Sequence, residues 1–440
     1  MWLQSGSNAA KLGSVMKAKS TSQINHRELA VSELRATCDP SSLPCETTNE
    51  LETLGDMIGQ DRASRAIQFG LGMKSFGYNL FVAGTPGTGK KTLIRTVVEK
   101  IAKTKPTPKD VFYVYNFDHP ERPKSIMVPP GVGCRFRTAM EGFMEELREE
   151  VPSAFKSEDF ERRRNEIMHV FQRVRADLLE KVQAEAREKG LAVKSSGSQI
   201  MTVPVVEGKE LSPDEYDSLA AEDKEIIQKN QIEVSETIQE VYRAVRSLQD
   251  ETQENLKELD RKVALIATGY YLEKLRHDFG EHEEILEYLG EMQRDVISNI
   301  SNFLEPEEEG GGDSPTDREA ALKRYKVNVI VDNSKQEGAP VITETHPTYR
   351  NLIGYAEREA RMGTLFTDFT LIRAGSVLMA NRGYLILDLV DLLSTPMAWD
   401  SLKRVLQDGE AKIQDPDEQF GGVGTLGLRP EPVEVDLKVI

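Results

Sequence analysis

The sequence predicts an α/β fold in which helices flank a parallel sheet and a long helical arm is inserted into the chain. Three features predict this fold. A glycine-rich loop at residues 84–92 stands between a short apolar run and a helical pattern. Further apolar runs of strand length occur at residues 325–333, 383–388 and 433–440. Between these parts, from 139 to 304, glycine is sparse and Glu, Lys, Arg and Gln dominate.

These changes of composition divide the chain into five segments. The first part of the α/β core holds two apolar runs, 78–84 and 110–117, which predict buried strands. In the last segment the chain stops inside an apolar strand pattern, which predicts that it is a fragment. The predicted segments are a polar N-terminal arm (1–53), the first core part (54–138), an inserted helical arm (139–304), an acidic, glycine-rich linker (305–316) and the second core part (317–440).

The inserted segment carries two runs of apolar residues at steps of three and four. One extends from Phe160 to Val182 and the other from Val241 to Val263. Such steps are typical of a coiled-coil-like seam. Two β-like runs separate them. We therefore expect two long antiparallel helices with a small β tip, with an ordinary helical bundle as the alternative.

Composition excludes several classes of protein. The chain has 440 residues, with 56 Lys and Arg against 73 Asp and Glu, so its formal net charge is -17. Such a charge repels phosphate backbones and disfavours a nucleic-acid partner. Three cysteines fit a reduced, cytoplasmic protein without a disulfide framework. No apolar run approaches the roughly 18 residues of a membrane span, so we expect no membrane partner.

The glycine-rich loop has the pattern of a phosphate-binding loop. Gly84, Gly89 and Lys90 supply the sequence GxxxxGK between a predicted strand and a predicted helix. Glycines let successive backbone N–H groups turn toward phosphates, the helix N-terminus favours an anion, and the lysine reaches the terminal phosphates. The predicted nucleotide-binding residues are Gly84, Thr85, Pro86, Gly87, Thr88, Gly89, Lys90, Lys91 and Thr92.

One position departs from this pattern. The residue after the loop lysine is usually Ser or Thr, whose hydroxyl holds Mg²⁺, but here it is Lys91. Thr92 lies about 100° further around the helix and cannot simply replace that hydroxyl. A second cation either weakens magnesium binding or replaces the metal electrostatically.

A candidate metal-binding acid ends the run 383–388. Asp388 follows four apolar residues, and an apolar strand that ends in Asp usually orients Mg²⁺ beside such a loop. The glutamate that polarises the attacking water would come next, but that residue is Leu389. Asp391 is the nearest acid and a candidate catalytic residue, although a capping role at a helix start is an equal alternative.

Residues 54–440 resemble the ATPase part of Lon-like proteases, in particular a bacterial branch related to archaeal membrane-type Lon. The resemblance rests on the segments IGQDRASRAIQFGLGMKSFGYNLFVAGTPGTGKKT, GAPVITETHPTYRNLIGYAEREARMGTLFTDFTLIRAGSVLMANRGYLILDLVDLL, AWDSLKRVLQDGEAKIQ and LRPEPVEVDLKVI. It implies an AAA+ module that uses ATP and Mg²⁺, works as a homo-hexameric ring and moves protein substrates to a Ser–Lys protease domain. In relatives that domain lies beyond the position of residue 440.

The resemblance also implies roles for two further groups of residues. Ile58, Gly59 and Gln60 match a segment near the adenine, with a helix-capping turn as the alternative. The region 349–361 matches a substrate-gripping pore loop. Its apolar candidates are Leu352, Ile353 and Tyr355, which are core residues of a helix in the alternative. Lys91 and Leu389 leave a second hypothesis open, a nucleotide-binding or substrate-binding scaffold that does not hydrolyse ATP.

Overall fold

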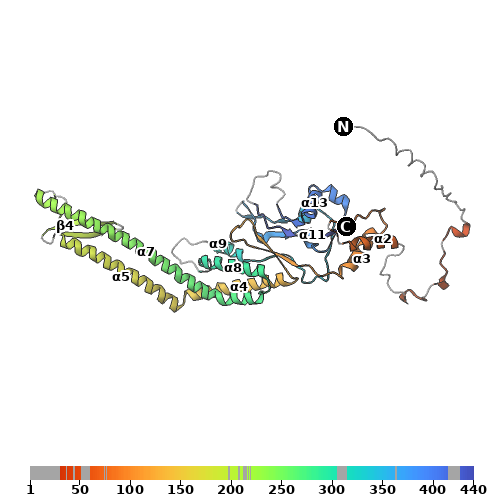
Figure 1. Cartoon of the computed structure of the whole chain (residues 1–440), viewed down its shortest axis with the longest axis horizontal. Helices are drawn as coiled ribbons and strands as arrows, with labels where there is room; N and C mark the ends of the chain where they lie inside the picture. Colours follow the sequence, from red (N-terminus) through yellow and green to blue (C-terminus); the bar gives the residue numbers. More distant parts are fainter. Residues whose placement is uncertain are drawn as a thin grey trace, which may run out of the picture. The chain divides into compact units, whose positions relative to one another are not determined.

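The computed structural model divides into two units, residues 1–59 and 60–440. In the first unit it contains the short 3-10 helices η1 (Val31–Glu33), η2 (Pro40–Ser42) and η3 (Thr48–Glu50). The second unit holds all the elements discussed below (Figure 1). The structure describes residues 30–35, 37–42, 45–50, 60–73, 75, 77–196, 199–206, 209–211, 216, 218, 220–304, 315–361, 364–414 and 427–440. The linker prediction lies almost wholly outside these residues.

An antiparallel sheet forms where the sequence predicts strands of a parallel one. Strand β1 (Asp110–Val114) pairs antiparallel with β2 (Lys124–Val128) on one side and with β6 (Asn328–Val331) on the other. The connection between β1 and β2 is short, which favours an antiparallel pair, because a parallel crossover needs a dozen or more residues. Strands β1 and β6 lie within the predicted runs 110–117 and 325–333, whereas β2 was not predicted, and none of the three belongs to the parallel sheet.

The parallel sheet is built from strands of the second core part. Strand β12 (Tyr384–Leu387) lies between β7 (Val341–Glu344) and β15 (Lys438–Val439) and is parallel to both. The carboxyl ends of β7 and β12 therefore meet at one edge, which places Glu344 and Asp388 there. The predicted run 433–440 is split, because β14 (Val433–Glu434) pairs instead with β13 (Glu410–Ala411).

The prediction of a buried strand at residues 78–84 is wrong. The backbone there has no strand assignment, although the N–H of Leu80 donates to the carbonyl of Val439 at 3.0 Å. The Phe81 side chain is 76% exposed. Strand β15 is only two residues long, so it offers too few backbone groups to extend a ladder along this segment.

Strand β1 is buried on both faces and joins two hydrophobic cores. Phe112 and Val114 point into the first core, with helices α4 (Val132–Phe155) and α8 (Glu283–Ser298). Val111 and Tyr113 point into the second core, which surrounds β12. Successive side chains of a strand alternate between its faces, so one strand can serve both cores.

A buried carboxylate fixes the start of β1. Asp110 Oδ2 accepts hydrogen bonds from the N–H groups of Gly131 at 2.7 Å and Gly133 at 3.0 Å. Its Oδ1 accepts one from the N–H of Asn333 at 2.8 Å. Burial raises the pKa of this carboxyl, and the three donors act in the opposite direction. Asp110 thus ties β1 to the first turn of α4 and to the segment after β6.

The inserted segment contains two long packed helices with a β tip. Helix α5 (Glu158–Glu188) and helix α7 (Ala221–Asp278) lie side by side (Figure 1). They run antiparallel, since Lys189 after α5 pairs with Glu233 in the first part of α7 at 3.1 Å. Val182 and Val234 belong to a small core of their own near the tip. The tip is an antiparallel sheet of β3 (Leu191–Ser196), β4 (Gln199–Val206) and β5 (Lys209–Glu210).

The boundary predicted at residue 139 falls inside helix α4, which begins at Val132. Helix α4 contacts α7 and belongs to the core that also contains Phe112 of β1. The base of the arm therefore continues directly into the sheet. The remaining elements are α2 (Asp61–Gly72), α3 (Lys90–Ala102), η4 (Ile300–Phe303), α9 (Pro315–Leu322), η5 (Lys323–Tyr325), α10 (Tyr349–Ile353), β8 (Gly354–Ala356), β9 (Glu359–Arg361), β10 (Thr364–Phe366), η6 (Phe369–Leu371), β11 (Ile372–Ala374), α11 (Ser376–Met379), α12 (Leu389–Ser394) and α13 (Ala398–Asp408).

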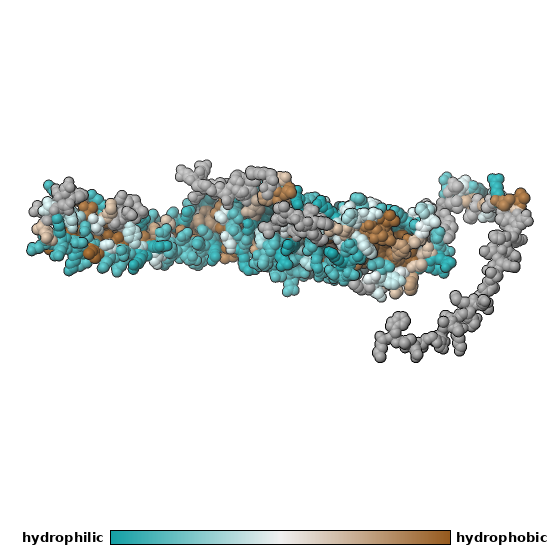
Figure 2. Space-filling view, turned by 90° about the horizontal axis from the view of Figure 1, so that it is seen from above, coloured by the Kyte–Doolittle hydropathy of each residue, from teal (hydrophilic) through white to brown (hydrophobic). Residues whose placement is uncertain are grey.

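The surface differs between the arm and the α/β part. Hydrophilic residues dominate the visible surface of the arm, and the largest hydrophobic area lies on the α/β part (Figure 2). In the described part of the chain, no helix has both the length and the apolar character needed to cross a membrane.

Candidate functional site

The glycine-rich loop leads directly into helix α3. Gly87 has φ 83° and Gly89 has φ 74°, both in the left-handed region that glycine adopts without strain. Gly89 immediately precedes α3, whose first residue is Lys90. The loop therefore presents backbone N–H groups at a helix N-terminus, which is the geometry that binds phosphate.

The side chains of the loop fold back onto its own backbone. The Lys90 ammonium donates a hydrogen bond to the carbonyl of Gly84, and Thr88 Oγ1 donates to the carbonyl of Thr85 at 2.9 Å. A Cβ atom at Gly84 would lie 3.2 Å from Cδ of Lys90, so a side chain there would crowd the lysine. Thr85, Pro86 and Thr92 are exposed.

The predicted adenine-contacting segment is only partly described. Ile58 and Gly59 lie outside the described residues. Gln60 immediately precedes α2, and its carbonyl accepts a hydrogen bond from the N–H of Ser64 at 2.9 Å. This backbone hydrogen bond places Gln60 at the start of α2, and the role of Gln60 near the adenine stays a prediction.

Lys91 and Asp388 lie together at the edge of the parallel sheet. Lys91 Nζ is 3.5 Å from Asp388 Oδ2. Asp388 also precedes α12, where its Oδ1 accepts a hydrogen bond from the N–H of Val390 at 3.1 Å. The Lys91 side chain is 84% exposed, so this ion pair contributes little to stability. Its significance is its position, because it joins the first turn of α3 to the end of β12.

The residues present fit the phosphates of a nucleotide better than they fit its metal ion. The loop glycines, the start of α3 and Lys90 have the geometry that suits an anion. For Mg²⁺ the site offers the carboxylate of Asp388, but Lys91 replaces the usual hydroxyl ligand and its ammonium already faces that carboxylate. No group of three or more His, Cys, Asp or Glu suited to a metal occurs among the described residues.

The structure gives Asp391 a helix-terminal position. It lies in the first turn of α12, its side chain is exposed, and a carboxylate there interacts favourably with the helix dipole. Leu389, the first residue of α12 after Asp388, is 38% exposed.

A further acid at this edge was missed by the sequence reasoning. Glu344 ends strand β7, and its Cα is paired with that of Leu387 on β12, next to Asp388. Its Oε1 accepts a hydrogen bond from the N–H of His346 at 2.8 Å. The signal was present in the sequence, since the segment APVITE ends in an acid just as YLILD does.

The predicted pore loop needs a correction. Leu352 and Ile353 are buried in the second core, so their side chains cannot grip a substrate in this conformation. Tyr355 is half-buried on β8, and the Arg350 guanidinium lies 5.8 Å from its ring centre. The exposed apolar side chains instead lie on the hairpin formed by β9 and β10. They are Leu365, at 49% exposure, and Phe366, at 51%.

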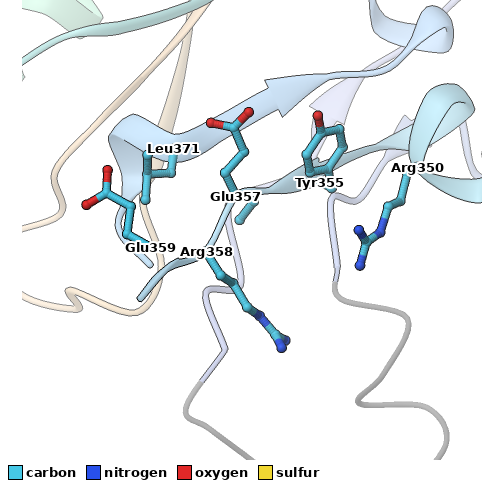
Figure 3. A pocket seen from close by; sticks show the side chains of 7 residues that line it. Arg350, Tyr355, Glu357, Arg358, Glu359 and Leu371 are labelled. Atoms are coloured by element: carbon cyan, nitrogen blue, oxygen red, sulfur yellow. The ribbon is translucent and has the colours of Figure 1, made fainter. Parts of the chain in front are cut away.

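A pocket of about 430 Å³ lies at the base of this hairpin (Figure 3). The carboxylates of Glu357 and Glu359 point to one side of it, and the guanidinium groups of Arg350 and Arg358 point to the other. Arg373 on β11 forms an ion pair with Glu357 at 3.0 Å. The pocket therefore has charged groups of both signs beside the apolar side chains of Ala356 and Leu371.

Two family models match parts of the chain. Residues 337–440 match the LonB-like AAA domain, and residues 110–143 match the Lon-like LonC helical domain. The search of curated proteins gives no match. The first match contains β7, Asp388 and the hairpin, and it supports an AAA+ fold. Together, the two matches support a Lon-like protein within that class.

Proposed function

We propose that this chain is the ATP-binding unfoldase and translocase module of a Lon-like ATP-dependent serine protease. In this proposal it binds ATP at residues 84–92, assembles as a homo-hexamer and delivers protein substrates to a protease domain. The observation that carries the proposal is the meeting of the glycine-rich loop, Lys91 and Asp388 at the carboxyl edge of a parallel sheet. Ligands of such sheets bind at that edge.

Each residue of the site has a defined role in the proposal. The loop N–H groups and Lys90 hold the phosphates, and Lys90 leaves the Gly84 carbonyl to do so. Asp388 would hold the magnesium ion that accompanies ATP, and a bound ion would neutralise charge on the phosphates. Lys91 lies beside Asp388 and supplies a second positive charge. Glu344 takes the role of the glutamate that is expected at position 389, and it positions water at the same edge.

The hairpin of β9 and β10 is the substrate-contacting element in this proposal. Leu365 and Phe366 both expose apolar side chains on this hairpin. A ring of such side chains can hold an unfolded chain without sequence specificity, since apolar burial is non-directional. The charged pocket at the hairpin base lies directly beside it.

A second candidate function is supported by the same ion pair. If the Lys91 ammonium keeps its contact with Asp388 when nucleotide binds, the metal loses its carboxylate and hydrolysis is lost. The chain would then be a nucleotide-responsive scaffold that holds substrate without turnover. Metal dependence and phosphate release separate the two candidates.

The decisive experiment is calorimetric titration of ATP and ADP into Lys90→Ala. We expect loss of measurable binding, because the loop loses the cation that reaches the terminal phosphates. Lys100→Ala is the matched control, since Lys100 lies in the last turn of the same helix and is exposed. Unchanged affinity in Lys90→Ala would overturn the proposal.

The contribution of Glu344 is tested separately by phosphate release from an assembled protein that turns over ATP. Glu344→Gln should retain nucleotide binding and lower turnover by about 10²-fold or more, the usual contribution of a positioned acid or base. Asp391→Asn is the matched control and should change turnover little. Equal effects of the two substitutions would remove Glu344 from its proposed role.

A further inference from the structure

Helix α7 has an exposed apolar face where it approaches the arm base. Ile266 is 79% exposed, Tyr270 is 75% exposed and Leu265 is 45% exposed. Because an α-helix turns by about 100° per residue, these three residues share one side of α7. The opposite side faces the protein interior, with Ala264, Thr268 and Leu272 buried. Three large apolar residues grouped on the outside of a charged helix indicate a contact surface.

A glycine lies in the centre of this face. A Cβ atom at Gly269 would meet no atom within 4 Å, so no contact inside the chain requires a glycine there. Glycine in a helix interior is less favourable than alanine. A close approach of another backbone is the usual reason to retain it, as at small-residue helix crossings.

Charged residues of opposite sign lie at the two ends of the face. Lys262 lies one turn before Leu265 and Ile266, and Glu273 lies one turn after Tyr270. Each has an ion pair within its own helix, Lys262 with Glu258 at 2.7 Å and Glu273 with Arg276 at 2.9 Å. Such exposed pairs are weak, so these charges can exchange partners on binding.

We infer that this face binds the same face of a second copy, with the two α7 helices antiparallel. A two-fold axis midway between residues 267 and 268 places Lys262 of one copy level with Glu273 of the other, at both ends of the contact. The same axis places Ile266 level with the gap above Gly269. Charge and shape are therefore complementary to a second copy in one register. This is the isologous pattern of a two-fold interface.

This contact is independent of the nucleotide site. A single helix crossing is smaller than a standard protein interface, so the association is weak and depends on protein concentration. It links the arms of two molecules, whatever ring their α/β parts form.

The test is sedimentation velocity of the full chain over a micromolar concentration series, with and without ATP. We expect Lys262→Glu to raise the dissociation constant of the arm contact about tenfold or more, because two like-charge contacts replace two attractive ones. The double variant Lys262→Glu, Glu273→Lys should restore association, since the exchanged charges again match. Lys274→Glu is the control, because Lys274 lies roughly 110° around the helix from the centre of the face.

Gly269→Ala is a second test, in which stability and association should change in opposite directions. It should raise the thermal midpoint, since alanine favours the helix, while it weakens association by filling the gap. If the wild type and Lys262→Glu associate equally, the inference is overturned, and the face binds a different molecule. Failure of the double variant to restore association overturns the antiparallel register.

Discussion

The two cores that meet at strand β1 differ in how their functional surfaces arise. Around β12, the candidate site is a set of loops at a sheet edge, where the proposed chemistry requires a particular residue type at each position. Around α4, α7 and α8, the outward surface is a helix face whose apolar and charged residues form no local sequence motif. A site with chemical requirements can therefore be recognised in a sequence, whereas a packing surface becomes visible only in the fold.

The largest expected effect is on the joint between the two cores. Asp110→Ala removes the acceptor of three buried N–H groups and should lower the free energy of unfolding by about 3 kcal/mol or more. Urea unfolding followed by tryptophan fluorescence and by circular dichroism would measure it. Asp332→Ala is the control, because this exposed carboxylate accepts one backbone N–H. Two transitions that separate in the wild type would show that the cores do not depend on a shared strand.

The second expected effect sharpens the chemistry of the sheet edge. Lys91→Thr frees Asp388 from its ammonium partner and provides a hydroxyl ligand, so nucleotide binding should gain a magnesium requirement. Titrating nucleotide affinity against Mg²⁺ for both proteins measures this. Lys100→Thr is the control on the same helix. Superimposable magnesium curves for wild type and Lys91→Thr would rule out a special role for Lys91.

A third effect concerns the hairpin. Replacing both Leu365 and Phe366 by Ser should weaken binding of an unfolded protein such as casein several-fold and leave nucleotide affinity unchanged. Fluorescence anisotropy of labelled casein measures the first quantity. The matched control is Val170→Ser, since Val170 is an exposed apolar residue on α5. Equal loss in the control would show that exposed apolar area in general, not the hairpin, holds the substrate.

The smallest expected effect tests whether the arm is separable. Deletion of residues 160–263 with a short Gly/Ser bridge should leave nucleotide affinity unchanged, because the core near the tip is distinct from both cores on β1. Leu272 and Leu275, which belong to the first core, remain in this variant. Calorimetry measures the affinity. An unfolded α/β part in the deletion variant would show that the two cores on β1 depend on the arm.

The sequence predicted the glycine-rich loop, the helix after it and the acid at the end of β12, because each has a local pattern. It also predicted two long helices from apolar spacing alone. It did not predict the partners of β1, since alternation within a strand does not say which strands flank it. For the same reason, the strand predicted at residues 78–84 was wrong. The segment is apolar, but the strand beside it is too short to pair with it.

Only part of the candidate site could be predicted, because some of its contacts join residues that are distant in the chain. The contact between Lys91 and Asp388 joins residues far apart in the chain, and only the packing of α3 beside the parallel sheet brings them together. Leu352 and Ile353 were plausible pore residues by position, but their burial depends on the second core. The adenine-contacting prediction at Ile58 and Gly59 stays a prediction.

The two-sided burial of β1 also has a consequence for hydrogen exchange. Both faces of the strand are covered by hydrophobic cores, and β2 and β6 flank its two edges, so its amides reach solvent only when a neighbouring strand separates and the cores beside it open. These amides should therefore be among the last in the chain to exchange with deuterium.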